Sequence, residues 1–79
     1  MATYFQAGKS FVNYITMMGF EFKENDSEKK YYVNKKGNQI RIDEKSQIIA
    51  LLDNKGFLVD FSKTYSSDEI NSFSNRINT

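Results

Sequence analysis

Two short segments of the chain carry the same turn signal, in which an Asn or Asp is followed three residues later by Gly. These segments are Asn34 to Gly37 and Asp53 to Gly56, and each has β-rich sequence on both sides. An Asx residue at the first position and a left-handed Gly at the fourth are typical of a type I turn that closes a hairpin with a bulge. The two segments therefore predict two β-hairpins within an antiparallel meander.

Alternation of apolar and polar residues with a period of two predicts five strands in this meander. They are expected at residues 20–23, 30–34, 39–43, 47–52 and 57–61. In the third strand, Ile40 and Ile42 are expected to face the core. In the fifth strand, the residues expected to face the core are Phe57, Val59 and Phe61. The fourth strand has apolar residues on both faces, which is typical of a strand covered on both sides.

A helical period of apolar residues predicts a first helix over residues 3–18. Its main apolar stripe contains Tyr4, Phe11, Val12, Ile15 and Met18. Thr3 is expected to cap the start of this helix, and Gly19 is expected to end it as a left-handed residue. A second helix is expected from Ser66, because Ser66 and Glu69 have the spacing of a capping box. Its apolar stripe contains Ile70, Phe73 and Ile77.

These elements predict a single small α+β domain over residues 1–79, with the element order α-βββββ-α. The hydrophobic content is 39%, without a long apolar run, and a chain of this length buries roughly 60% of its surface on folding. An amphipathic helix and a half-buried sheet must bury their apolar faces against each other. We therefore expect both helices to pack on one face of the antiparallel sheet.

The composition removes most catalytic and metal-binding chemistry. The chain has no Cys and no His, so disulfides are excluded and the usual ligands of zinc and iron-sulfur sites are missing. Without His, only carboxylates, Lys and Tyr remain as general acids or bases. The four glycines, at positions 8, 19, 37 and 56, form no phosphate-binding loop. The sequence therefore predicts a protein that is not an enzyme, with no catalytic residue, no cofactor and no metal.

The charge balance restricts the class of partner. Eleven basic and ten acidic side chains give a net charge of +1, which argues against a partner held mainly by bulk electrostatics. The start of the chain has no signal-peptide pattern, and no stretch has the roughly 20 apolar residues of a membrane-spanning helix. We expect a cytoplasmic protein without a membrane partner. The richness in Lys, Asn and Ile suits an AT-rich bacterial or phage genome.

A meander also predicts where the charged turns gather, because alternate turns lie at the same end of a sheet. The two Asx-Gly turns would bring together a basic end of Lys35, Lys36 and Lys55. The opposite end would carry Glu24, Asp26, Glu28, Asp43 and Glu44, joined by Asp68 and Glu69. The basic end has two interpretations, as solvated loops or as a docking site for an anionic partner.

The outer face of the sheet, away from the helices, is the second candidate surface. If the predicted core-facing residues are correct, several apolar side chains must face outward. They are Ile49, Leu51 and Leu58, together with one of the neighbours Tyr31 and Tyr32. Monomers rarely leave such a patch bare, so either the chain forms a homodimer or a protein partner covers this face. The alternative is a curled sheet that buries these residues itself.

The sequence therefore favours a small protein-interaction module, a regulator, inhibitor or accessory factor of phage or mobile-element type, which binds a partner or itself through the outer sheet face. The alternative function is weak nucleic-acid binding by a basic hairpin with interleaved tyrosines. The residues of that hairpin are Lys29, Lys30, Tyr31, Tyr32, Lys35, Lys36 and Arg41. Strong salt dependence of oligonucleotide binding would favour this alternative.

Overall fold

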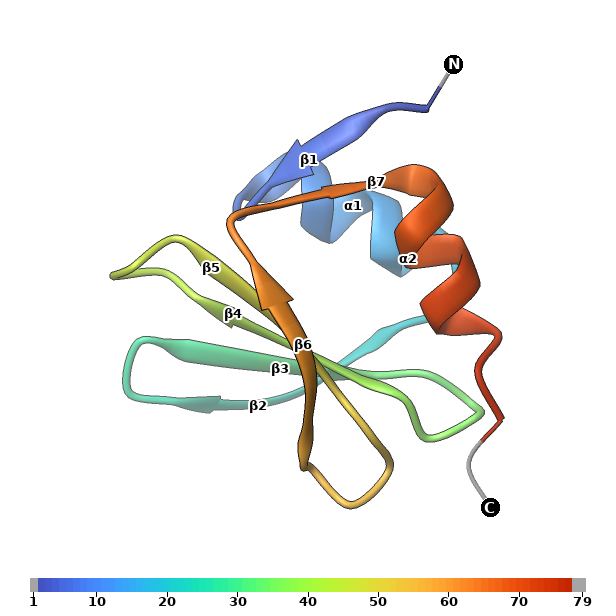
Figure 1. Cartoon of the computed structure of the whole chain (residues 1–79). Helices are drawn as coiled ribbons and strands as arrows, with labels where there is room; N and C mark the ends of the chain where they lie inside the picture. The colour runs from blue at the N-terminus through green and yellow to red at the C-terminus, as the bar shows by residue number, and fades with distance from the viewer. Residues whose placement is uncertain (1, 78–79) are drawn as a thin grey trace.

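The computed structural model describes residues 2–77 and contains a five-stranded antiparallel sheet, a two-stranded sheet and two helices (Figure 1). The large sheet contains β2 (Glu21–Asp26), β3 (Lys29–Val33), β4 (Gln39–Asp43), β5 (Ile48–Leu52) and β6 (Leu58–Ser62), in that spatial order. The helices α1 (Lys9–Met17) and α2 (Ser67–Ser74) pack on one face of this sheet. The predicted α+β fold with a five-stranded meander is confirmed.

Both predicted Asx-Gly turns are present and have nearly the same geometry. Asn34 Oδ1 accepts hydrogen bonds from the N–H groups of Lys36 and Asn38, both at 3.0 Å. Asp53 Oδ1 accepts hydrogen bonds from the N–H groups of Lys55 and Phe57, both at 2.9 Å. Gly37 and Gly56 have φ of 85° and 86°, in the left-handed region that favours glycine. The hydrogen bonds that close both turns are therefore made within five residues of the chain.

The N-terminal segment differs from the predicted helix over residues 3–18. Residues Tyr4–Gln6 form a strand, β1, which pairs with β7 (Thr64–Ser66), and α1 begins only after Gly8. The ring of Phe5 stacks on Tyr14 at a centroid distance of 4.7 Å, so the strand is held against α1. Thr3 does not cap a helix, and its carbonyl instead accepts a 2.7 Å hydrogen bond from the N–H of Ser67. Pairing with a strand 60 residues away replaced the local helical preference.

The ends of the two helices follow the predicted signals more closely. Gly19, with φ of 102°, follows the last turn of α1, as expected for a left-handed C-terminal residue. Ser66 caps α2 with Glu69 in a complete capping box, with hydrogen bonds of 2.9 and 3.1 Å. Ile77 was expected in the apolar stripe of α2, but the helix ends at Ser74 and Ile77 is exposed.

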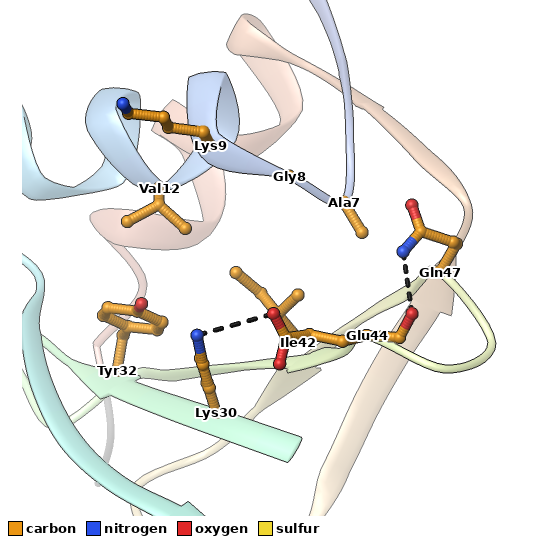
Figure 2. Close-up of a pocket in the computed structure, with 9 residues that line it drawn as sticks. All are labelled: Ala7, Gly8, Lys9, Val12, Lys30, Tyr32, Ile42, Glu44 and Gln47. Atoms are coloured by element: carbon orange, nitrogen blue, oxygen red, sulfur yellow. Dashed lines mark hydrogen bonds and ion pairs between the residues drawn. The ribbon is translucent and has the colours of Figure 1, made fainter. Parts of the chain in front are cut away.

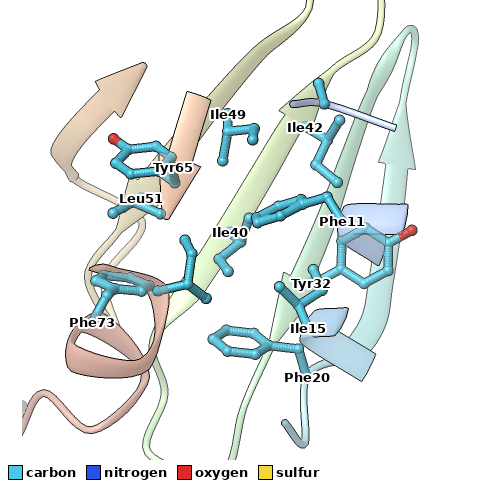
Figure 3. Packing of buried hydrophobic residues seen from close by; sticks show 12 residues of the cluster. Phe11, Ile15, Phe20, Tyr32, Ile40, Ile42, Ile49, Leu51, Tyr65 and Phe73 are labelled. Carbon is cyan, nitrogen blue, oxygen red and sulfur yellow. The ribbon is translucent and has the colours of Figure 1, made fainter. Parts of the chain in front are cut away.

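The hydrophobic core lies between the helices and the inner face of the large sheet (Figure 3). Phe11 and Ile15 come from α1, and Ile70 and Phe73 from α2. The sheet supplies Tyr32, Ile40, Ile42, Ile49 and Leu51, which are all at most 7% exposed. The expected inward orientation of Ile40 and Ile42 is therefore confirmed.

The predicted orientation of the fifth meander strand is wrong. Asp60 lies opposite Leu51 in the pairing of β5 with β6, and Phe61 lies opposite Ala50. Since directly paired residues share a face and Leu51 is in the core, Asp60 faces the helices and Phe61 faces outward. A bulge between Leu51 and Leu52 then shifts the register, so that Leu52 pairs with Leu58. Phe57, Val59 and Phe61, which were expected in the core, are all exposed.

Candidate interaction surface on the outer sheet face

Four large apolar side chains of β6 and the turn before it are exposed. They belong to Phe57, Leu58, Val59 and Phe61, which are 67%, 54%, 39% and 57% exposed. We call these four residues the β6 apolar surface. Leu58 and Phe61 lie on the outer sheet face, whereas Val59 lines a hollow beside α2. β6 pairs only with β5, so its other side is an open edge of the five-stranded sheet. A bulge at an edge strand opposes pairing with further strands, while the exposed side chains remain available for contact.

A partly buried hydrogen bond holds β6 in this orientation. Tyr65 is 2% exposed, and its hydroxyl donates a 3.0 Å hydrogen bond to Asp60 Oδ2. Burial and this bond raise the pKa of the Tyr65 hydroxyl above its ordinary value, and the negative charge of Asp60 acts in the same direction. The bond joins the helix-facing side of β6 to β7, so the next side chain of β6, Phe61, lies on the opposite face.

This hydrogen bond predicts a pH dependence of stability. A pKa raised in the folded state means that the folded protein holds more protons than the unfolded chain above about pH 10. The contribution of Tyr65 to stability is therefore complete below about pH 10 and is lost as the pH rises above it. Urea unfolding of the wild type and Tyr65→Phe across this range should show a shallower loss for the variant. If the unfolding free energies of the two proteins fell in parallel as the pH rises, the predicted contribution of the Tyr65 hydroxyl would be contradicted.

A polar hollow of about 320 Å³ lies on the same outer face, and we call it the Arg41 hollow. Its charged side chains are those of Lys23, Glu24, Asp26, Arg41 and Lys55. A cross-strand row runs from Tyr31 through Arg41 and Ala50 to Phe61, since each residue is paired with the next. Residues in such a row share one face, so this row connects the Arg41 hollow with the β6 apolar surface.

The structure divides the residues that were predicted to bind a partner. Ile49 and Leu51 are 0% and 5% exposed in the core, so the expectation that they face outward is wrong. The helices cover them, because β5 presents these two residues on the same face as Ile40 and Ile42 of β4. Of the remaining residues, Leu58 is exposed on the outer face and Tyr31 is half-buried there, whereas Tyr32 is in the core.

The predicted basic hairpin is also divided between faces. Lys30 and Tyr32 face α1 across a cavity of about 280 Å³, where Lys30 Nζ forms a 3.4 Å ion pair with Glu44 (Figure 2). Lys29 lies on the opposite face of β3 from Lys30 and Tyr32, and it pairs with Asp43 of β4. Tyr31 and Arg41 share the face of Lys29. A period of two along each strand separates neighbours in sequence, so the run of basic residues does not form one continuous surface.

The charged ends are only partly as expected. The two Asx-Gly turns share one end of the sheet, but Lys55 lines the Arg41 hollow whereas Lys35 and Lys36 line a different one beside α2. Lys36 Nζ lies 3.4 Å from Asn75 Oδ1, because the C-terminal end of α2 docks on this turn. At the opposite end, one hollow collects Asp26, Glu28, Lys29, Asp43 and Lys45. Asp68 and Glu69 lie elsewhere, in a hollow with Asp60.

Sequence reasoning missed Phe57, Val59 and Phe61 as surface residues. All five residues of β5 are apolar, so the sequence contains no alternation from which the faces of β5 and β6 could be matched. The one available signal was Asp60, a carboxylate within an apolar strand, which is exposed but accepts a hydrogen bond from the buried Tyr65 on the helix side of the sheet.

No family model, curated protein or solved structure matches this chain. Within residues 2–77, neither helix is long and apolar enough to cross a membrane. The same residues contain no group of three or more His, Cys, Asp or Glu side chains that could hold a metal ion.

Proposed function

We propose that the protein is a small, non-enzymatic interaction module that binds an extended segment of a partner protein on the outer face of its sheet. The proposal is carried by one observation, the exposure of two large apolar side chains, Leu58 and Phe61, on the outer face of the sheet. A regulator, inhibitor or accessory factor would act in this way, by occupying a segment of its target.

The exposure of apolar side chains on the outer face supports a binding role. Leu58 and Phe61 are both more than half exposed there, and large apolar side chains exposed together on one face often mark binding sites. Binding of a partner segment would remove these side chains from water, which favours association.

The charges favour a protein segment over a nucleic acid. The Arg41 hollow contains three cations and two carboxylates, Glu24 and Asp26, beside the apolar surface. The lysines of the basic hairpin point to different faces, so they do not line one track for a phosphate backbone. A segment with apolar side chains matches the exposed surface better than a polyanion does.

The first test is a selection of random linear peptides displayed on phage against the immobilised protein. The wild type is compared with the double variant Leu58→Lys/Phe61→Lys, in which two exposed apolar anchors become charged. We expect peptides rich in apolar residues to be enriched on the wild type and to bind the double variant at least tenfold more weakly, about 1.4 kcal/mol. Lysine at these exposed positions should leave the fold intact.

Met17→Lys is the matched control, because Met17 is an 86% exposed apolar residue on α1, on the other side of the sheet. It should bind the selected peptides like the wild type. Equal binding to the double variant, or no enrichment at all, would contradict the proposed function. Concentration-dependent dimerisation of the wild type that is lost in the double variant would identify a second copy, instead of a partner segment, as the occupant.

A further inference from the structure

Arg41 lies on β4, the middle strand of the large sheet, and no side chain or backbone group among residues 2–77 is bonded to its guanidinium. Its Nε atom is the one fully buried side-chain nitrogen or oxygen, among residues 2–77, that makes no hydrogen bond. The side chain also forms no ion pair with any of these residues. The terminal guanidinium nitrogens are not fully buried, so they are the part of Arg41 that meets the Arg41 hollow. Unsatisfied buried groups are rare in native proteins and call for an explanation.

The other charges around the hollow suggest what would satisfy Arg41. Lys23 Nζ is 3.4 Å from Gln39 Oε1, and Lys55 stands on the turn that borders the hollow. With Glu24 and Asp26 also present, the hollow has one cation more than it has carboxylates. A ligand with one negative charge would balance this single excess positive charge. A planar carboxylate can accept two parallel N–H donors from a guanidinium, whereas a doubly charged phosphate would meet repulsion from Glu24 and Asp26.

The position of Arg41 relative to β6 identifies the source of such a carboxylate. Arg41 and Phe61 lie in one cross-strand row with Ala50 between them, and two strand spacings separate them by about 10 Å. An extended chain covers this distance in about three residues. We propose that the Arg41 hollow binds the carboxylate of an Asp or Glu side chain about three positions from the apolar anchor of the partner segment, an inference that rests on the proposed function.

The chain offers a direct probe, because Arg41 and Arg76 are its only arginines. Their Nε–H groups give two NMR signals at mildly acidic pH, where guanidinium protons exchange slowly. Sodium acetate is titrated into the wild type at constant ionic strength, with sodium chloride as the replaced salt. We expect the Arg41 signal to shift and saturate with a dissociation constant on the order of millimolar, while the signal of exposed Arg76 stays in place.

Variants of Arg41 and a second anion complete the test. Arg41→Gln should abolish the acetate-dependent shifts of the backbone amides of Leu52 and Gly56, which line the hollow, and Arg41→Lys should weaken binding several-fold. Inorganic sulfate, which carries two negative charges at this pH, should bind more weakly than acetate. Linear, equal movement of both arginine signals, unchanged titration of Arg41→Gln, or tighter binding of sulfate would each overturn the proposal.

The source of the carboxylate is tested with the selected peptides. Replacing their Asp or Glu by Asn or Gln should weaken binding to the wild type several-fold and leave binding to Arg41→Gln unchanged. An equal loss on both proteins would overturn the pairing with Arg41. Failure of the proposed function is distinguishable, because it appears as insensitivity to Leu58→Lys/Phe61→Lys, whereas the acetate titration does not depend on those side chains.

Discussion

Leu51→Asp is expected to leave the protein unfolded at neutral pH, whereas Leu58→Asp is expected to keep its fold. Leu51 is 5% exposed and packs in the core with Ile40 and Phe73 (Figure 3). Removing a buried Leu costs about 2–5 kcal/mol, and burying an unpaired carboxylate adds several more. A domain of 79 residues has only roughly 4–12 kcal/mol of stability, so this single change exceeds or exhausts it.

The same substitution at Leu58 compares a surface residue with the core residue Leu51, because both variants replace Leu by Asp. Leu58 is 54% exposed on the outer face, so its replacement by Asp should cost about 1 kcal/mol, mainly through the lower strand preference of Asp. Circular dichroism melts and amide NMR spectra of both variants measure the difference. A folded Leu51→Asp variant that merely loses self-association would show instead that Leu51 lies on a binding surface.

Asn38→Asp is expected to destabilise the protein by on the order of 3–5 kcal/mol at neutral pH, although the two side chains have nearly the same shape. Asn38 is fully buried, and its Nδ2 group donates to the carbonyls of Phe73, Ser74 and Arg76 at 3.2, 3.4 and 2.9 Å. A carboxylate would direct a charged acceptor at three carbonyl oxygens. The docking of α2 on the turn before β4 depends on this contact.

Urea denaturation across pH tests the physical cause of this loss. Protonation of the new carboxyl restores one donor, and burial raises its pKa in the folded state, so the gap between the stabilities of the variant and the wild type should narrow as the pH falls from neutral toward about 4. Asn75→Asp is the control at the same helix end, because Asn75 is exposed and its replacement should change stability by less than about 1 kcal/mol. Equal losses for the two variants would contradict a special role for Asn38.

Local signals in the sequence were sufficient for the elements whose stability is local. The Asx-Gly turns at residues 34–37 and 53–56 satisfy their hydrogen bonds within five residues, and the capping box of Ser66 and Glu69 within four. The strand over 39–43 alternates cleanly, and its boundaries were predicted to the residue. These features place the meander and the start of α2.

The candidate site was less predictable, because each error came from a partner far away in sequence. Residues 4–6 pair with β7, so the helix expected over residues 3–18 begins only at Lys9. Arg41 was selected as one of a basic run, but its surroundings on the outer face come from β2, β3 and the turn after β5. No local pattern describes a hollow built from four separate segments.

The sequence by itself therefore determined the α+β class, the hairpins and the order of the strands, because turn geometry and alternation act over a few residues. The tertiary structure alone decided which face of each strand is buried. A shift of one residue in register moves every side chain of a strand to the opposite face, and the register of β6 depends on a bulge and on the hydrogen bond between Tyr65 and Asp60. Those contacts bury Leu51 and expose Leu58 and Phe61.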